Sequence, residues 1–125
     1  MVLCVVDDLL FSVKISTAAK ALGVDMYFER TAEMVLPRVR ERQPTLVIFD
    51  LNSGRLQPLA AIAAMKDDPA LKTIPTLGFV AHVDSERIAA ARAAGIDQVL
   101  ARSAFSDRLG EILSAADPPA GATGP

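Results

Sequence analysis

The chain has 125 residues, a formal net charge of -2 and a hydrophobic fraction of 51%. This length predicts one domain with its own core, and the slightly acidic balance argues against nucleic acid as a direct partner. The single cysteine, Cys4, excludes a disulfide within the monomer, which suits a reducing compartment. No apolar stretch is long enough to span a bilayer, and no basic region precedes the first apolar run, so we expect a soluble cytoplasmic protein without a membrane partner.

Strand-like and helix-like segments alternate along the chain. Strands are expected at residues 2–6, 25–29, 45–50, 75–80 and 98–101. Helices are expected at residues 11–22, from Thr31 to about 42, from Pro58 to about 66, from the Asp84-Ser85-Glu86 stretch to Gly95, and from Ser103 or Ser106 to about 116. Residues 117–125 are rich in Pro, Gly and Ala and are predicted to be a flexible tail behind a domain of residues 1–116.

Five strands alternating with five helices predict an α/β domain with a parallel sheet. Right-handed crossovers on both faces favour the doubly wound strand order 2-1-3-4-5, which is the flavodoxin-like arrangement. In this order the first and third strands are neighbours. Side chains that follow these two strands are therefore expected to meet at one edge of the sheet.

Aspartates end both of those strands. Asp7 and Asp8 follow the apolar run 2–6, and Asp50 follows the run 46–49. Two like charges about 4 Å apart cost on the order of 4 kcal/mol at an effective dielectric constant of ~20, so a hard divalent cation, most simply Mg²⁺, is expected among them. Without the cation, mutual repulsion should raise the pKa of at least one carboxyl group, and removing Asp8 should stabilise the domain.

The segments 3–8, 46–52 and 95–105 make the chain resemble a response regulator receiver domain over residues 1–116. The resemblance implies that Asp50 accepts a phosphoryl group from a phosphohistidine of a sensor histidine kinase or phosphotransfer protein. It also implies that Asp8 binds Mg²⁺ directly, that Asp7 does so through water, and that the backbone carbonyl of Asn52 is a further ligand. The positions implied to contact the phosphoryl group are Arg102, Ser53 and Ala81.

Several positions depart from the pattern of that family. Val80 stands where a Thr or Ser hydroxyl is usual, and Val99 stands where an aromatic switch residue is usual. Arg102 replaces a lysine, and Ser103 replaces the proline after it. His82 is expected near the rim of the pocket or simply in an exposed loop. The acceptor half of the site therefore looks intact, while the half that reports phosphorylation looks altered.

Two functions stay open at this point. The first is a stand-alone receiver of a two-component phosphorelay, a phospho-acceptor signalling domain rather than an enzyme, with a homodimer through the fourth helix, fifth strand and fifth helix as one further expectation. The second is a pseudo-receiver that binds protein partners independently of phosphorylation. A cofactor-binding enzyme of the same fold has little support, since no Gly-rich phosphate loop follows the first strand.

Overall fold

A computed structural model describes residues 1–81 and 84–117. Within them a single parallel sheet has the strand order β2-β1-β3-β4-β5, which confirms the predicted topology. The strands are β1 (Val2–Val5), β2 (Met26–Phe28), β3 (Leu46–Asp50), β4 (Thr76–Val80) and β5 (Gln98–Ala101). The helices are α1 (Leu9–Leu22), α2 (Val35–Arg42), α3 (Pro58–Asp67), α4 (Ser85–Ala94), α5 (Arg102–Asp107) and α6 (Leu109–Ala116), with 3-10 turns at Ala32–Met34 and Gly54–Leu56.

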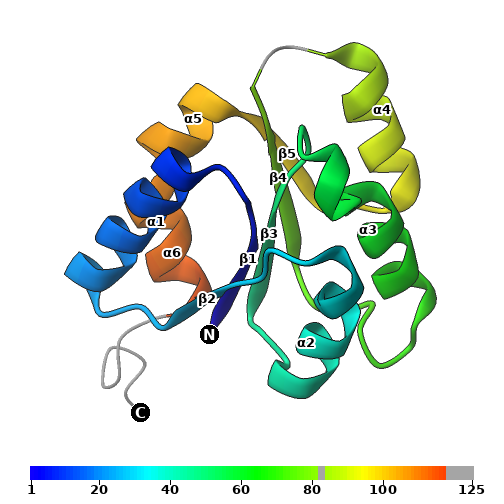
Figure 1. The fold of residues 1–125 in the computed structure, drawn as a ribbon, viewed down its shortest axis with the longest axis horizontal. Helices are drawn as coiled ribbons and strands as arrows, with labels where there is room; N and C mark the ends of the chain where they lie inside the picture. Colours follow the sequence, from blue (N-terminus) through cyan, green and yellow to red (C-terminus); the bar gives the residue numbers. More distant parts are fainter. Residues whose placement is uncertain (82–83, 118–125) are drawn as a thin grey trace.

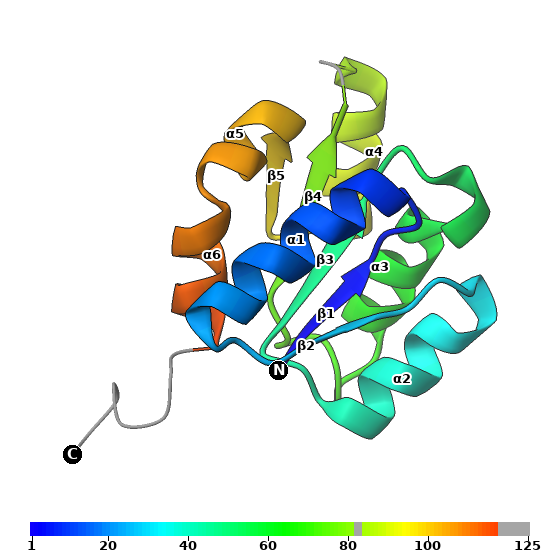
Figure 2. The same cartoon turned by 60° about the vertical axis from the view of Figure 1, so that its left-hand side comes forward.

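The sheet lies between two layers of helices, with α1, α5 and α6 on one face and α2, α3 and α4 on the other (Figures 1 and 2). Alternate residues of one strand reach opposite faces, so Leu3 and Val5 pack with the α2–α4 side while Cys4 packs with α1 and α6. All four residues of β1 and all five of β3 are buried. Burial on both faces explains why these strands are continuous apolar runs rather than alternating patterns.

Side-chain and glycine caps set the ends of two long helices. The carboxylate of Asp8 accepts a hydrogen bond from the Phe11 amide at the start of α1, and that of Asp84 accepts one from the Arg87 amide at the start of α4. Gly23 ends α1 with a φ of 69°, a left-handed conformation that suits glycine. The capping by Asp8 starts α1 two residues before the position predicted from composition.

Two predictions about helix starts are wrong. The Thr31 side chain makes no capping hydrogen bond, and a 3-10 turn precedes α2, which places Pro37 in the first turn of that helix, where proline is tolerated. Neither Ser103 nor Ser106 caps the last helix, because α5 begins directly after β5 at Arg102. The last predicted helix is also divided at Arg108 into α5 and α6, and Gly110, a poor helix former, lies in the first turn of α6. The described residues therefore contain six α-helices where five were expected.

Asp117 was expected in the tail but is tied to the domain. Its carboxylate accepts a hydrogen bond from the amino terminus at 3.3 Å and another from the Asp25 amide at 3.1 Å. The expected tail residues 118–125 and the candidate rim residue His82 lie outside the described residues. No helix of the described residues has the length and apolar character needed to cross a bilayer.

A polar network joins α3, β4 and β5 at the edge of the sheet where the strands begin. Asp97 accepts hydrogen bonds from the amide and hydroxyl of Thr76, at 2.8 and 2.9 Å, and from Nζ of Lys66 at 2.9 Å. The Asp97 amide in turn donates to the Thr76 hydroxyl at 3.1 Å. Burial acts to raise the pKa of Asp97, but the hydrogen bonds from Lys66 and Thr76 outweigh it and lower the pKa overall.

We expect Asp97→Ala to destabilise the domain by about 1–2 kcal/mol, since it removes charge-assisted hydrogen bonds at a partly exposed site. A carboxyl group whose folded-state pKa is lowered contributes stability above its unfolded-state pKa and loses it as the pH falls through the folded-state pKa. The difference in urea midpoint between wild type and variant should therefore shrink in acid. The exposed Asp107→Asn serves as the control, and a difference that stays constant down to strongly acidic pH would contradict this account.

Candidate functional site

The three aspartates predicted to share one edge of the sheet do so. Strand β1 pairs with β3 in a register that sets Val5 opposite Phe49. Asp50 is the last residue of β3, and Asp7 and Asp8 form the turn between β1 and α1. The adjacency of the two strands therefore brings one acidic pair and one single carboxylate to the carboxyl end of the sheet.

Asp50 is the most buried of the three, with 9% of its surface exposed. Its Oδ1 accepts a hydrogen bond from the Asn52 amide at 2.9 Å. Burial raises the pKa of Asp50, and the charges of Asp7 and Asp8 add to the effect, while the Asn52 hydrogen bond and Arg102 oppose it. The expected rise in pKa is confirmed for this residue, although desolvation rather than repulsion is its main cause.

Asp8 is in the opposite electrostatic situation. One of its oxygens accepts the Phe11 amide at 3.0 Å, and the other accepts Nη2 of Arg102 at 2.7 Å. The backbone hydrogen bond from Phe11 and then the Arg102 side chain lower the pKa of Asp8. Asp8 therefore holds its negative charge more firmly than Asp50, which argues against the prediction that removal of Asp8 stabilises the metal-free domain.

Two arginines balance the acidic pair. Arg102, which the sequence singled out, begins α5 and places its guanidinium carbon 4.3 Å from the centre of the Phe11 ring. Arg55, which the sequence analysis missed, donates from Nε to Asp7 at 3.0 Å. Its only signal in the sequence was a basic residue in the loop that follows Asp50.

The loop after Asp50 is tied to the loop after β4. The side-chain oxygen of Asn52 accepts a hydrogen bond from the Ala81 amide at 2.6 Å. Arg87 of α4 donates from Nη1 to the carbonyl oxygen of Leu51 at 2.8 Å. The Ala81 amide, implied by the resemblance to contact a phosphoryl group, thus already has a hydrogen-bond partner inside the chain. Arg87 is the second residue, after Arg55, that the sequence analysis missed.

The side chains of the remaining candidate positions in the described residues make no polar contact with Asp50, although the Ser53 amide donates to the Asp50 carbonyl oxygen at 3.2 Å. The Ser53 hydroxyl is buried and has no hydrogen-bond partner in the described structure. Val80 ends β4 and is 1% exposed, while Val99 of β5 is partly buried against the α2–α4 side of the sheet. A valine at position 80 offers no hydroxyl to a group on Asp50.

The donor types at this site fit a hard divalent cation, since they are carboxylates and a backbone carbonyl. Asp7 and Asp8 both influence the pKa of Asp50, so the three charges lie within mutual electrostatic reach. Within residues 1–81 and 84–117, however, no three acidic, cysteine or histidine side chains are grouped closely enough to hold a metal ion. A cation would therefore compete with the two arginines for oxygens that they occupy.

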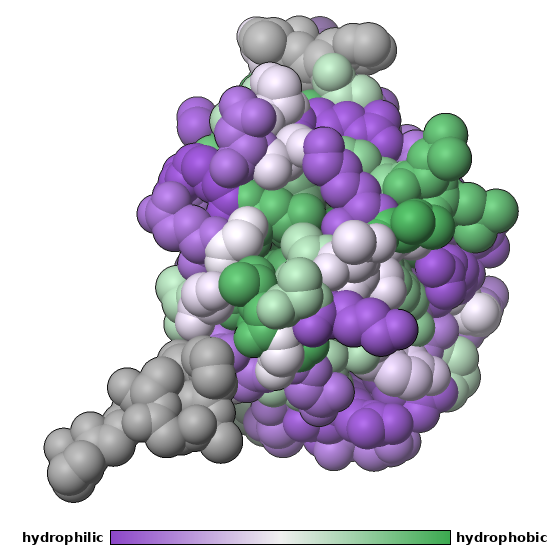
Figure 3. Space-filling view, turned by 90° about the vertical axis from the view of Figure 1, so that its left-hand side faces the viewer, coloured by the Kyte–Doolittle hydropathy of each residue, from purple (hydrophilic) through white to green (hydrophobic). Residues whose placement is uncertain are grey.

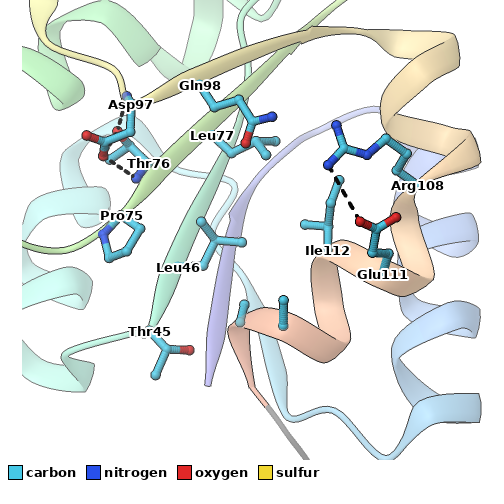
Figure 4. A pocket seen from close by; sticks show the side chains of 12 residues that line it. Thr45, Leu46, Pro75, Thr76, Leu77, Asp97, Gln98, Arg108, Glu111 and Ile112 are labelled. Atoms are coloured by element: carbon cyan, nitrogen blue, oxygen red, sulfur yellow. Dashed lines mark hydrogen bonds and ion pairs between the residues drawn. The ribbon is translucent and has the colours of Figure 1, made fainter.

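A hollow of about 420 Å³ lies elsewhere, between the starts of β3, β4 and β5 and helix α6 (Figure 4). Leu46, Leu77 and Ile112 form its floor, and an ion pair between Arg108 and Glu111 lies at its side. It is at the opposite end of the strands from Asp50. The hollow is therefore not part of the carboxylate site.

No protein-family model and no curated protein matches the chain. Solved structures share its fold. A response regulator from Hahella chejuensis is 20% identical over 92% of both chains with a TM-score of 0.82. The Mn(2+)-bound response regulator Rcp1 is 19% identical over 90% of this chain and 91% of its own (TM-score 0.76), and the phosphorylated cyanobacterial phytochrome response regulator RcpA is 20% identical over 91% and 88% (TM-score 0.74). The resemblance to receiver domains is thus confirmed for the fold.

The raised pKa of Asp50 predicts that Asp50→Asn stabilises the domain near neutral pH. A carboxyl group whose folded-state pKa is raised contributes stability that is fully present below its unfolded-state pKa and is lost as the pH rises through the folded-state pKa. The variant keeps an acceptor for the Asn52 amide and has no charge to bury. Its melting temperature should exceed that of wild type by a few degrees at pH 7 and match it near pH 3. A variant less stable than wild type at pH 7 would refute the raised pKa of Asp50.

Asp8→Ala should have the opposite effect on the metal-free protein. It removes the cap of α1, which is worth about 1 kcal/mol or roughly 4 °C in melting temperature for a domain of this size, and it leaves Arg102 without its carboxylate. Asp7→Ala is the matched control, because Asp7 pairs only with the exposed Arg55 side chain and caps no helix. Thermal melts in the presence of a chelator would decide, and a rise in stability for Asp8→Ala would show that repulsion dominates after all.

Proposed function

We propose that this chain is a receiver module of a two-component phosphorelay, in which Asp50 accepts a phosphoryl group from a phosphohistidine on a sensor histidine kinase or phosphotransfer protein. The observation that carries the proposal is the position of Asp50. It lies at the carboxyl end of β3, largely buried, and next to Asp8 and Arg102. The solved structures of the same fold are response regulators, one of them phosphorylated, which favours a signalling role over a classical enzyme.

The residues of the pocket suit phosphoryl transfer. The Asp50 carboxylate attacks phosphorus while the bond to the histidine nitrogen breaks, and negative charge spreads over the phosphoryl oxygens. Arg102 carries a permanent positive charge and lies close enough to Asp50 to oppose part of the rise in its pKa that burial causes. The residues that the resemblance implies as Mg²⁺ ligands are Asp8, Asp50, the Asn52 carbonyl and, through water, Asp7, and a bound Mg²⁺ would supply further neutralisation. In the described residues these side chains are not grouped closely enough to hold the ion, so they would have to rearrange to bind it.

The surface beside the pocket suits a protein phosphodonor. Leu9, Leu10 and Val13 of α1 are 71%, 86% and 64% exposed, directly after Asp8 in the chain. Apolar surface is visible among polar surroundings on the side of the molecule that carries α1 (Figure 3). A donor that presents its phosphohistidine to Asp50 would cover these side chains, which makes them the natural contact area for the kinase or phosphotransfer protein.

The other partner expectations follow the same proposal. The acidic net charge gives nucleic acid no favourable surface, and the buried Cys4 suits the cytoplasm. A homodimer would use α4, β5 and the predicted fifth helix, which the structure divides into α5 and α6; β5 is an edge strand with partly exposed side chains.

A pseudo-receiver is the second candidate, and a specific set of contacts favours it. The Ala81 amide is bonded to Asn52, Val80 has no hydroxyl, and arginines occupy both Asp7 and Asp8. In this form the domain would bind its partner in one fixed conformation. Its partner binding would be the same for wild type and for Asp50→Asn, with or without a phosphoryl mimic.

The two candidates separate in one experiment. The protein is incubated with Mg²⁺ and acetyl phosphate, and its intact mass is measured over time. A receiver should gain one phosphoryl group in wild type and in the control Asp107→Asn, but not in Asp50→Asn, because the proposal assigns acceptance to Asp50. Absence of a mass gain in wild type at every Mg²⁺ concentration would reject phosphoryl acceptance from small donors and leave the pseudo-receiver.

A further inference from the structure

A hollow of about 280 Å³ lies beside the start of α3, where α3 and α4 run side by side (Figure 1). Leu51, Pro58 and Leu59 give it apolar walls, and Arg87 of α4 is the one charged side chain among the described residues that line it. None of the three aspartates of the carboxylate site lines this hollow, and neither does Arg102. The hollow is therefore a separate feature of the surface.

The start of α3 differs from the starts of α1 and α4, because no side chain caps it. Gln57 occupies the cap position with a φ of 51°, and its side chain accepts no hydrogen bond from the helix. The first backbone hydrogen bond of α3 runs from the Ala61 amide to the Gln57 carbonyl. Among the described residues the amides of Leu59 and Ala60 therefore have no hydrogen-bond partner, and both residues line the hollow. This end of α3 presents N–H donors and the positive end of the helix dipole.

Ser53 lines the same hollow and is a second, independent sign of a ligand. Only 8% of Ser53 is exposed, and its hydroxyl has no hydrogen-bond partner in the described structure. A buried hydroxyl without a partner costs free energy, so such a group is normally satisfied by a ligand or an ordered water molecule. The Ser53 hydroxyl is thus a donor that the chain itself leaves unused.

Arg87 brings a positive charge to the hollow from α4. It donates from Nη1 to the Leu51 carbonyl at 2.8 Å and from Nε to the Asp84 carboxylate at 3.4 Å. A guanidinium carries five N–H donors, so Arg87 keeps donors for a ligand while it makes both of these bonds. The Asp84 side chain is 41% exposed, and solvent weakens its attraction for Arg87.

We propose that this hollow binds a small oxyanion, a carboxylate or a phosphate group, between the start of α3 and Arg87. The polar groups that meet there are two helix amides, a hydroxyl and a guanidinium, which are the donors that oxyanions prefer in proteins. A volume of about 280 Å³ leaves room for the anionic group and a few carbon atoms packed against Leu51 and Leu59. Binding here does not depend on phosphoryl transfer to Asp50, so the site adds to the proposed function.

NMR titration of the ¹⁵N-labelled full chain with inorganic phosphate, and separately with acetate, tests the proposal at an ionic strength held constant with sodium chloride. At least one of the two anions should give saturable shifts of the Ser53, Leu59 and Ala60 amides, and the tighter one identifies the chemistry of the ligand. Arg87→Gln and Ser53→Ala should each weaken binding about tenfold, because each removes a hydrogen bond to a charged group. Arg92→Gln is the matched control, since it removes the same charge from the exposed last turn of α4 and should change the affinity by about twofold at most.

Melting curves without either anion provide a second measurement. Ser53→Ala should be at least as stable as wild type there, because it deletes a buried hydroxyl that has no partner, so its weaker anion binding cannot come from unfolding. Equal weakening by Arg87→Gln and Arg92→Gln would assign the effect to general charge attraction and overturn the proposal. The absence of saturable shifts with both anions, or binding that Ser53→Ala leaves unchanged, would overturn it as well. Shifts confined to the amides around Asp50 and Arg102 would place the anion at the carboxylate site instead, which also contradicts the proposal.

Discussion

The parallel pairing of β1 with β3 is the constraint on which the rest of the structure depends. Both strands are buried on both faces, and alternate residues belong to two different core clusters. A slip of one residue would turn each side chain to the opposite face of the sheet, where it would not fit the side chains of the helices on that face. The packing of the two clusters therefore fixes the register. That register, with Val5 opposite Phe49, places Asp7 and Asp8 beside Asp50. The carboxylate site is therefore a consequence of core packing rather than of attraction among its own members.

The three carboxylates share one edge but differ in what surrounds them. Asp8 is stabilised as an anion by a helix amide and a guanidinium, and Asp7 pairs with an exposed arginine. Asp50 is instead desolvated, with its charge opposed by burial. This division reduces the repulsion within the acidic cluster, because two of its three charges are paired with arginines. It also leaves Asp50 as the carboxylate whose negative charge a nearby positive group would stabilise most. This property suits a residue proposed to accept a phosphoryl group.

Sequence patterns were sufficient for the strand order and for the position of Asp7, Asp8 and Asp50, because apolar runs and the rules of parallel sheets determine both. They were insufficient for contacts made by long side chains. Nothing in the spacing of Arg55 or Arg87 indicates that the first reaches Asp7 and the second the Leu51 carbonyl. One side chain can also serve two purposes: Asp8 is an expected metal ligand, and its capping of α1 is a second role that the sequence analysis did not predict. The serines before the last helix have good capping chemistry, but β5 leads into α5 without a gap.

Asn52 links Asp50, the proposed acceptor, to the rest of the domain in a way that does not need a hydroxyl at position 80. Its amide donates to Asp50, and its side-chain oxygen accepts from Ala81 at the end of β4. The neighbouring Leu51 carbonyl is held by Arg87 of α4, whose own helix is capped by Asp84. Any change in charge or size on Asp50 therefore acts first on Asn52, and through it on Ala81, which follows β4. Because Arg87 holds the Leu51 carbonyl to α4, Asn52 and Arg87 together connect Asp50 and the segment after it to both β4 and α4, in a chain whose position 80 is valine.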